Sequence, residues 1–166
     1  MYRCAPFGES GFRLRSAVLV MLLSLGLLGC VSQARMNQMD DEDDIREAVI
    51  HRLINEASTT IKPSATAYFL AFGPQDDDPP MDFMVRFQGN LPPVYRFSRC
   101  KVTAGKGVVD RISGGDGVLF SIMEIHWVAP DEVSVSTAYY ESMVNSAKVS
   151  YQVKKGDQGW KVVMPR

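Results

Sequence analysis

Cysteine, histidine and tryptophan are scarce in this chain of 166 residues, which has three cysteines and two each of the other two. The cysteines stand at positions 4, 30 and 100, and no paired Cys or His spacing of a zinc site occurs. An excess of positive charge is also missing, because the formal net charge is −1. We therefore predict no metal site and no nucleic-acid partner.

Motifs for nucleotide binding and acyl transfer are missing as well. TAGKGVVDRISGGDG, residues 103–117, is rich in glycine but lacks the spacing and the lysine of a P-loop. It also lacks the order of glycine, serine and glycine that a serine nucleophile elbow needs. We predict no cofactor and interpret this segment as a long hairpin connection.

The sequence also lacks an apolar run long enough to span a membrane. AVLVMLLSLGLLG, residues 17–29, is uncharged but only thirteen residues long, whereas a membrane-spanning helix needs about 20. Arg3, Arg13 and Arg15 precede this run against a single acidic residue. A basic stretch followed by a short apolar run is typical of a secretory signal, with a membrane span as the alternative.

The apolar run ends in LLGC, residues 27–30. This tetrapeptide resembles the lipobox of bacterial lipoproteins, in which the signal is cut before a cysteine that then receives a diacylglyceryl group and an N-acyl chain. The resemblance implies that residues 1–29 are a lipoprotein signal peptide and that residues 30–40 are an acylated cysteine and a tether. Several palmitate-length chains on Cys30 would make membrane attachment effectively permanent.

The residue after the cysteine is Val31, and its identity bears on sorting. In two-membrane bacteria, a residue other than aspartate at this position implies release to the outer membrane, so we expect a lipid-anchored protein facing the periplasm. Residues 1–29 hold three arginines and one glutamate, so the remainder has 15 basic and 18 acidic residues against 18 and 19 in the whole chain. That remainder is long enough for one domain, residues 41–166.

The domain reads as α+β. Residues 40–57 have an acidic start and an apolar arc of helical period, and residues 81–88 predict a short second helix. Strands are predicted at 66–72 and 94–102, and a four-stranded antiparallel meander covers 118–128, 132–142, 147–155 and 159–164. We expect the first helix to pack on a curved antiparallel sheet.

This order of elements, helix first and a terminal meander ending in GWKVV, is similar to that of the small exported NTF2-like domains and of cystatin-like domains. The similarity lies in the order of the elements and in no diagnostic motif. It implies a sheet that forms one wall of a cone, in which NTF2-like enzymes place acid and base groups.

Glu124 and His126 form the single acid–base pair that the pattern suggests. Strand alternation places them on one face, and Met123, Ile125 and Trp127 on the other. If the turn at 129–131 pairs Val128 with Glu132, the residues that share the face of Glu124 and His126 are Ser134, Ser136 and Tyr140, while Val133, Val135 and Tyr139 join Trp127. A solvated sheet face accounts for the same pair without catalysis.

Basic residues gather between positions 86 and 111, where only Asp110 opposes them: Arg86, Arg96, Arg99, Lys101, Lys106 and Arg111. We name Arg96, Arg99 and Lys101 as candidate binding residues for an anionic partner, and Trp127 and Tyr140 as candidates for a ligand pocket. A charged strand edge and ordinary core packing are the alternatives. Cys100 reads as a small buried filler or a reactive thiol.

Three functions remain open at this point. The first is a lipid-anchored envelope protein whose domain binds a small ligand or an envelope protein without catalysis. The second is a small NTF2-like enzyme that uses His126 and Glu124. The third is a cystatin-like inhibitor of an envelope hydrolase, which needs exposed loops that form one wedge.

Overall fold

The computed structural model describes residues 39–103 and 107–165, and from Asp41 on they form one compact unit. The predicted signal peptide 1–29, Cys30 and the tether up to residue 38 lie outside the described residues, as does Lys106. Within the described ranges, no helix has both the length and the apolar character needed to cross a membrane.

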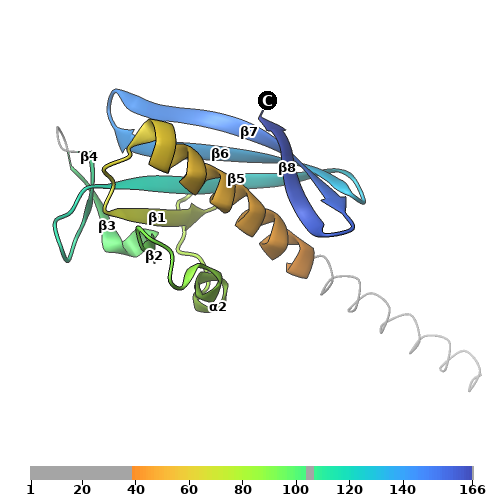
Figure 1. Ribbon diagram of the computed structural model, residues 1–166, viewed down its shortest axis with the longest axis horizontal. Coiled ribbons are helices and arrows are strands. Elements are labelled where there is room, and N and C mark those ends of the chain that lie inside the picture. The colour runs from red at the N-terminus through yellow and green to blue at the C-terminus, as the bar shows by residue number, and fades with distance from the viewer. Residues whose placement is uncertain (1–38, 104–106, 166) are drawn as a thin grey trace, which may run out of the picture. The chain divides into compact units, whose positions relative to one another are not determined.

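The unit consists of a long N-terminal helix, short helical turns and eight strands (Figure 1). The helix covers residues 39–56 and continues as a π-helical turn, Ala57–Ile61. The remaining elements are β1 Ala67–Phe72, α2 Met81–Met84, η2 Val85–Phe87, β2 Val94–Arg96, η3 Phe97–Arg99, β3 Cys100–Thr103, β4 Gly107–Asp110, β5 Gly117–Ala129, β6 Glu132–Ser142, β7 Asn145–Gly156 and β8 Gly159–Pro165.

Six strands form one curled sheet in the order β2-β1-β5-β6-β7-β8, and β3 pairs with β4 alone. The expectation of an antiparallel sheet is wrong for its first half, since β1 runs parallel to both β2 and β5. The chain crosses over between these strands through α2 and through the β3–β4 hairpin, and such connections allow parallel pairing. The predicted strand 94–102 is broken by η3, which separates β2 from β3.

The meander β5–β8 is antiparallel, as predicted. The predicted register also holds at its centre, where Trp127 pairs with Val133 and Glu124 pairs with Ser136. At the turn, however, Ala129 rather than Val128 pairs with Glu132, because the register shifts after Trp127. The α+β class and the terminal meander are therefore confirmed.

The N-terminal helix covers the inner face of the sheet (Figure 1). Its apolar arc is sealed, since Ile45, Val49, Ile50 and Leu53 are at most 1% exposed. These side chains share one core with inner-face residues of the sheet such as Phe120. The periodicity of this helix thus predicted both its position and its buried side.

The outer face carries a second, smaller core beneath the β3–β4 hairpin. Its buried residues are Ala67, Phe69, Ala71, Cys100, Val108 and Leu119. Gly107, with a φ of 79°, brings β4 so close to β6 that a Cβ there would overlap the carbonyl oxygen of Glu141. The segment interpreted as a connection therefore contains a packed strand, β4.

Candidate functional site

A hollow of about 580 Å³ lies on the outer face of the sheet, beside the β3–β4 hairpin. Leu119 and Ser121 of β5 and Ala138 and Tyr140 of β6 contribute to its lining. Met123 of β5 also lines it, together with Asp76 from the loop after β1, Val102 of β3 and Lys148 of β7. The hollow thus combines apolar walls with a few polar groups, as ligand sites commonly do.

The polar end of the hollow is a hydrogen bond between Ser121 and Asp76. The Ser121 hydroxyl donates to Oδ1 of Asp76 over 2.7 Å, and Ser121 is 6% exposed. Asp76 lies in the loop after β1 with a φ of 55°, a left-handed conformation that is uncommon outside glycine. No ion pair joins Asp76 to any charged side chain in the described part of the chain.

A β-bulge after Ile122 alters which residues line the outer face. The register of β5 against β6 shifts between Ile122 and Glu124, so Met123 is the extra residue. Met123 therefore lines the hollow with Leu119 and Ser121, whereas the prediction placed it only on the opposite face; it also borders a smaller cavity beside Ile125. Simple strand alternation does not anticipate an inserted residue.

Glu124 and His126 lie on the outer face as predicted, and both are exposed. Their cross-strand partners are Ser136 and Ser134, which is the expected pairing. Among the contacts of the described residues, no hydrogen bond or ion pair joins Glu124 to His126, and neither lines the hollow. The structure therefore does not bring this pair into a desolvated site.

The two predicted aromatic binding residues lie on opposite faces. Tyr140 lines the outer hollow. Trp127 packs on the inner core and meets the ring of Trp160 edge to face, with 5.5 Å between centroids. The indole nitrogen of Trp127 is buried and has no hydrogen-bond partner among the described residues. Trp127 thus contributes to the covered face, as predicted, and not to the hollow.

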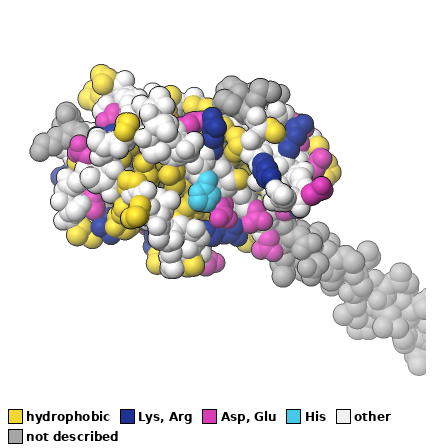
Figure 2. Space-filling view, in the orientation of Figure 1, with side chains coloured by type: hydrophobic (Ala, Val, Ile, Leu, Met, Phe, Trp, Pro, Cys, Tyr) yellow, Lys and Arg dark blue, Asp and Glu magenta, His cyan; other side chains and the backbone are white. Residues whose placement is uncertain are grey.

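Three of the six residues of the predicted basic group are paired with acids. Arg86 contacts Asp44 and Glu47 at 2.7 and 2.5 Å, and Arg96 lies 3.4 Å from Asp78. Figure 2 shows basic side chains interspersed with acidic ones on the face that it draws. Lys101 is exposed and stands apart from these pairs. A continuous basic surface is therefore not formed by these arginines.

Arg99 fastens the β3–β4 hairpin from the side of η3. Its guanidinium makes two hydrogen bonds to Asp110, of 3.0 and 2.9 Å, and lies 3.4 Å from the ring centre of Tyr95. The Arg99 hydrogen bond, with donors from Ile112 and Ser113, lowers the pKa of the buried Asp110 carboxyl well below its usual range. Arg99 thus has a structural role.

A second groove of about 380 Å³ lies between α2–η2 and β2–η3. Its lining is rich in apolar side chains and includes the predicted binding residues Arg96 and Arg99: Met81, Met84, Val85, Phe87, Val94, Tyr95, Arg96 and Arg99. Both arginines are held by acids, at Asp78 and Asp110. This groove therefore offers less unpaired charge than the outer hollow.

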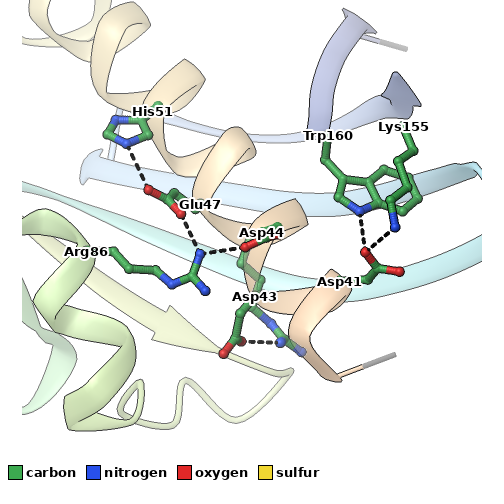
Figure 3. A network of polar contacts seen from close by, with 9 residues as sticks. Asp41, Asp43, Asp44, Glu47, His51, Arg86, Lys155 and Trp160 are labelled. Carbon is green, nitrogen blue, oxygen red and sulfur yellow. Dashed lines mark hydrogen bonds and ion pairs between the residues drawn. The ribbon is translucent and has the colours of Figure 1, made fainter. Parts of the chain in front are cut away.

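The start of the N-terminal helix is held by charges on both sides (Figure 3). Asp41 accepts hydrogen bonds from Lys155 and Trp160, chiefly the former, and these bonds lower its pKa. On the other side, Arg86 contacts Glu47, which also lies 3.7 Å from His51. The network explains how the helix is fixed on the inner face and leaves that face covered.

The remaining candidates for reactive groups are the Cys100 thiol and possible metal ligands. Burial raises the pKa of the Cys100 thiol to about 11, so this thiol is protonated at neutral pH. In the described part of the chain, no three His, Cys, Asp or Glu side chains are grouped as metal ligands. Compared with protein families, curated proteins and solved structures, the chain matches none of them.

Proposed function

We propose that this chain is a lipid-anchored protein of the bacterial envelope whose domain binds a small molecule in the outer hollow without catalysis. The hollow carries the proposal, because it combines about 580 Å³ of space with the Asp76 carboxylate, which accepts a hydrogen bond from Ser121 and forms no ion pair with a described residue. The exposed, unconnected positions of Glu124 and His126 favour binding over turnover. The helix on a curled sheet supports an NTF2-like or cystatin-like architecture.

A fragment screen by NMR on the full chain in detergent micelles tests the binding site. We expect hits to shift the resonances of Leu119, Ser121 and Met123, and the variant Ala138→Leu to remove these shifts by filling the hollow. Ser150→Leu is the matched control, because Ser150 lies on β7 and does not line the hollow. Hits that persist in Ala138→Leu would refute the assignment.

The anchor has its own test. Cys30→Ser should abolish acylation because serine has no thiol to receive the diacylglyceryl group, and metabolic labelling with a fatty-acid analogue measures this. Undiminished label would refute the lipoprotein assignment. Fractionation should then place the native protein in the outer membrane, and recovery from the inner membrane alone would refute the sorting.

An inhibitor of an envelope hydrolase is a second candidate. It is favoured by the β6–β7 turn, where Met143 and Val144 are 78% and 97% exposed. This apolar tip is of the kind that inserts into a partner. Replacing both residues with aspartate should remove inhibition of hydrolase activity in envelope extracts, whereas Ala138→Leu should not.

A further inference from the structure

The row of residues across the floor of the outer hollow has opposite charges at its two ends. Ser121 pairs with Ala138 across β5 and β6, and Ala138 pairs with Lys148 across β6 and β7. Strands lie about 4.8 Å apart, so Ser121 and Lys148 are separated by about 10 Å between Cα atoms. Asp76 contacts the Ser121 end, and Lys148 lines the other end.

Both charges are available to a ligand. The Asp76 carboxylate accepts a single hydrogen bond from the described residues, the one from Ser121. Lys148 is exposed and forms no ion pair with any described residue, unlike Lys154 and Lys155 on the same strand. A ligand with one positive and one negative group could therefore form an ion pair with Asp76 at one end of the row and with Lys148 at the other.

The middle of the row is small and apolar. Ala138 leaves space above the sheet, and the neighbouring row provides walls through Leu119 and Tyr140, which are paired across β5 and β6. Met123 also lines this space. Such walls suit apolar side chains, while a ligand with negative charge alone would place that charge against Asp76.

We propose that the outer hollow binds a short zwitterionic peptide, whose amino group pairs with Asp76 and whose carboxylate pairs with Lys148. An extended chain advances about 3.3 to 3.6 Å per residue, so two or three residues match the length of the row. This inference rests on the proposed function, because it assigns a ligand class to the same hollow.

Calorimetric titration of the full chain in detergent micelles tests the proposal with three probes: dialanine, N-acetyl-dialanine and dialanine amide. Partly exposed ion pairs are worth up to about 1 kcal/mol, which is a factor of about five. We expect each cap to weaken binding about fivefold, because each cap removes one charge. Equal affinity for all three probes would overturn the zwitterion inference while leaving the hollow as the site.

Two variants assign each charge to its residue. Asp76→Asn should weaken dialanine about fivefold and leave N-acetyl-dialanine unchanged, and asparagine is chosen because it tolerates the left-handed backbone at this position. Lys148→Gln should weaken dialanine and leave the amide unchanged. Asp131→Asn and Lys161→Gln are the matched controls, since both residues are exposed and neither lines the hollow.

These experiments test separately whether the hollow is a binding site and whether its ligand is a zwitterionic peptide. If Ala138→Leu abolishes binding of every probe but Asp76→Asn and Lys148→Gln have no effect, the hollow is a site and its ligand is not zwitterionic. If no probe binds the wild-type protein at up to 20 mM, a concentration of about 20 times a millimolar Kd, the peptide assignment is refuted. In that case the fragment screen alone decides whether the hollow is a site.

Discussion

The two faces of the sheet are covered to different extents. On the inner face, a helix of five turns packs its apolar arc against β5–β8, and Phe120 and Tyr151 are fully buried. On the outer face, a short hairpin covers β1 and the start of β5 and leaves a hollow beside it. The inner face therefore holds the larger core, and the outer face keeps the partly open surface at which we propose that a ligand binds.

The largest expected effect tests the inner face. Phe120→Ala removes a fully buried ring and should lower the free energy of unfolding by about 3 to 5 kcal/mol. Val128→Ala is the control on the same strand, because Val128 is 59% exposed and should change stability little. Urea unfolding of the full chain measures both, and similar losses in the two variants would contradict the assignment of the core.

A smaller loss of stability is expected where the β3–β4 hairpin packs against β6 on the outer face. Gly107→Ala combines a positive φ with overlap at Glu141 and should cost about 2 to 4 kcal/mol. Gly156→Ala is the control, since a Cβ there meets nothing within 4 Å. If Gly107→Ala unfolds at the same urea concentration as wild type, β4 does not pack against β6 as described.

The Arg99–Asp110 contact should give the hairpin a pH dependence. Asp110→Asn should cost about 1 to 3 kcal/mol at pH 7. Because the pKa of Asp110 is lower in the folded state than its unfolded value of about 3.9, this stabilisation is present above that value and is lost as the pH falls below it.

Urea unfolding at pH 7 and at pH 3 measures this dependence. The difference between wild type and Asp110→Asn should narrow at pH 3, and Asp131→Asn should show no such pattern. A difference that stays constant between the two pH values would contradict the contribution of the ion pair.

The smallest effect concerns the exposed part of the outer face. Glu124→Gln and His126→Gln should each change the free energy of unfolding by less than about 0.5 kcal/mol, because both side chains are exposed and lack partners among the described residues. Both variants should also bind dialanine like wild type. If either variant lowered the free energy of unfolding by more than about 1 kcal/mol, or no longer bound dialanine, Glu124 and His126 would have to be counted among the binding residues.

The periodic parts of the fold could be predicted from the sequence. The helix arc through Ile45, Val49 and Leu53 and the alternation of β6 were sufficient to assign their buried sides. The parallel pairing of β1 was not predicted, because a short apolar strand pairs in either direction and the crossover through α2 is a tertiary feature. The bulge at Met123 inserts one residue that alternation alone does not reveal.

The polar end of the candidate site was also missed. Ser121 is the single polar residue in the buried part of β5, and this interruption was the one available signal. Asp76 stands in a run of three aspartates, and nothing in the sequence distinguishes it from its neighbours. The pairing of the arginines with Asp44, Asp78 and Asp110 depends on residues that only the fold brings together.

The central claim is that ligands bind in the outer hollow and not in the groove beside α2. Methyl NMR of methionine in the full chain separates the two, because Met123 lines the hollow and Met84 lines the groove. On titration with dialanine and with its doubly capped form, we predict a saturable shift of the Met123 methyl with both probes, at lower concentration for free dialanine, and a constant Met84 signal. A shift of Met84 with Met123 unchanged would contradict the account.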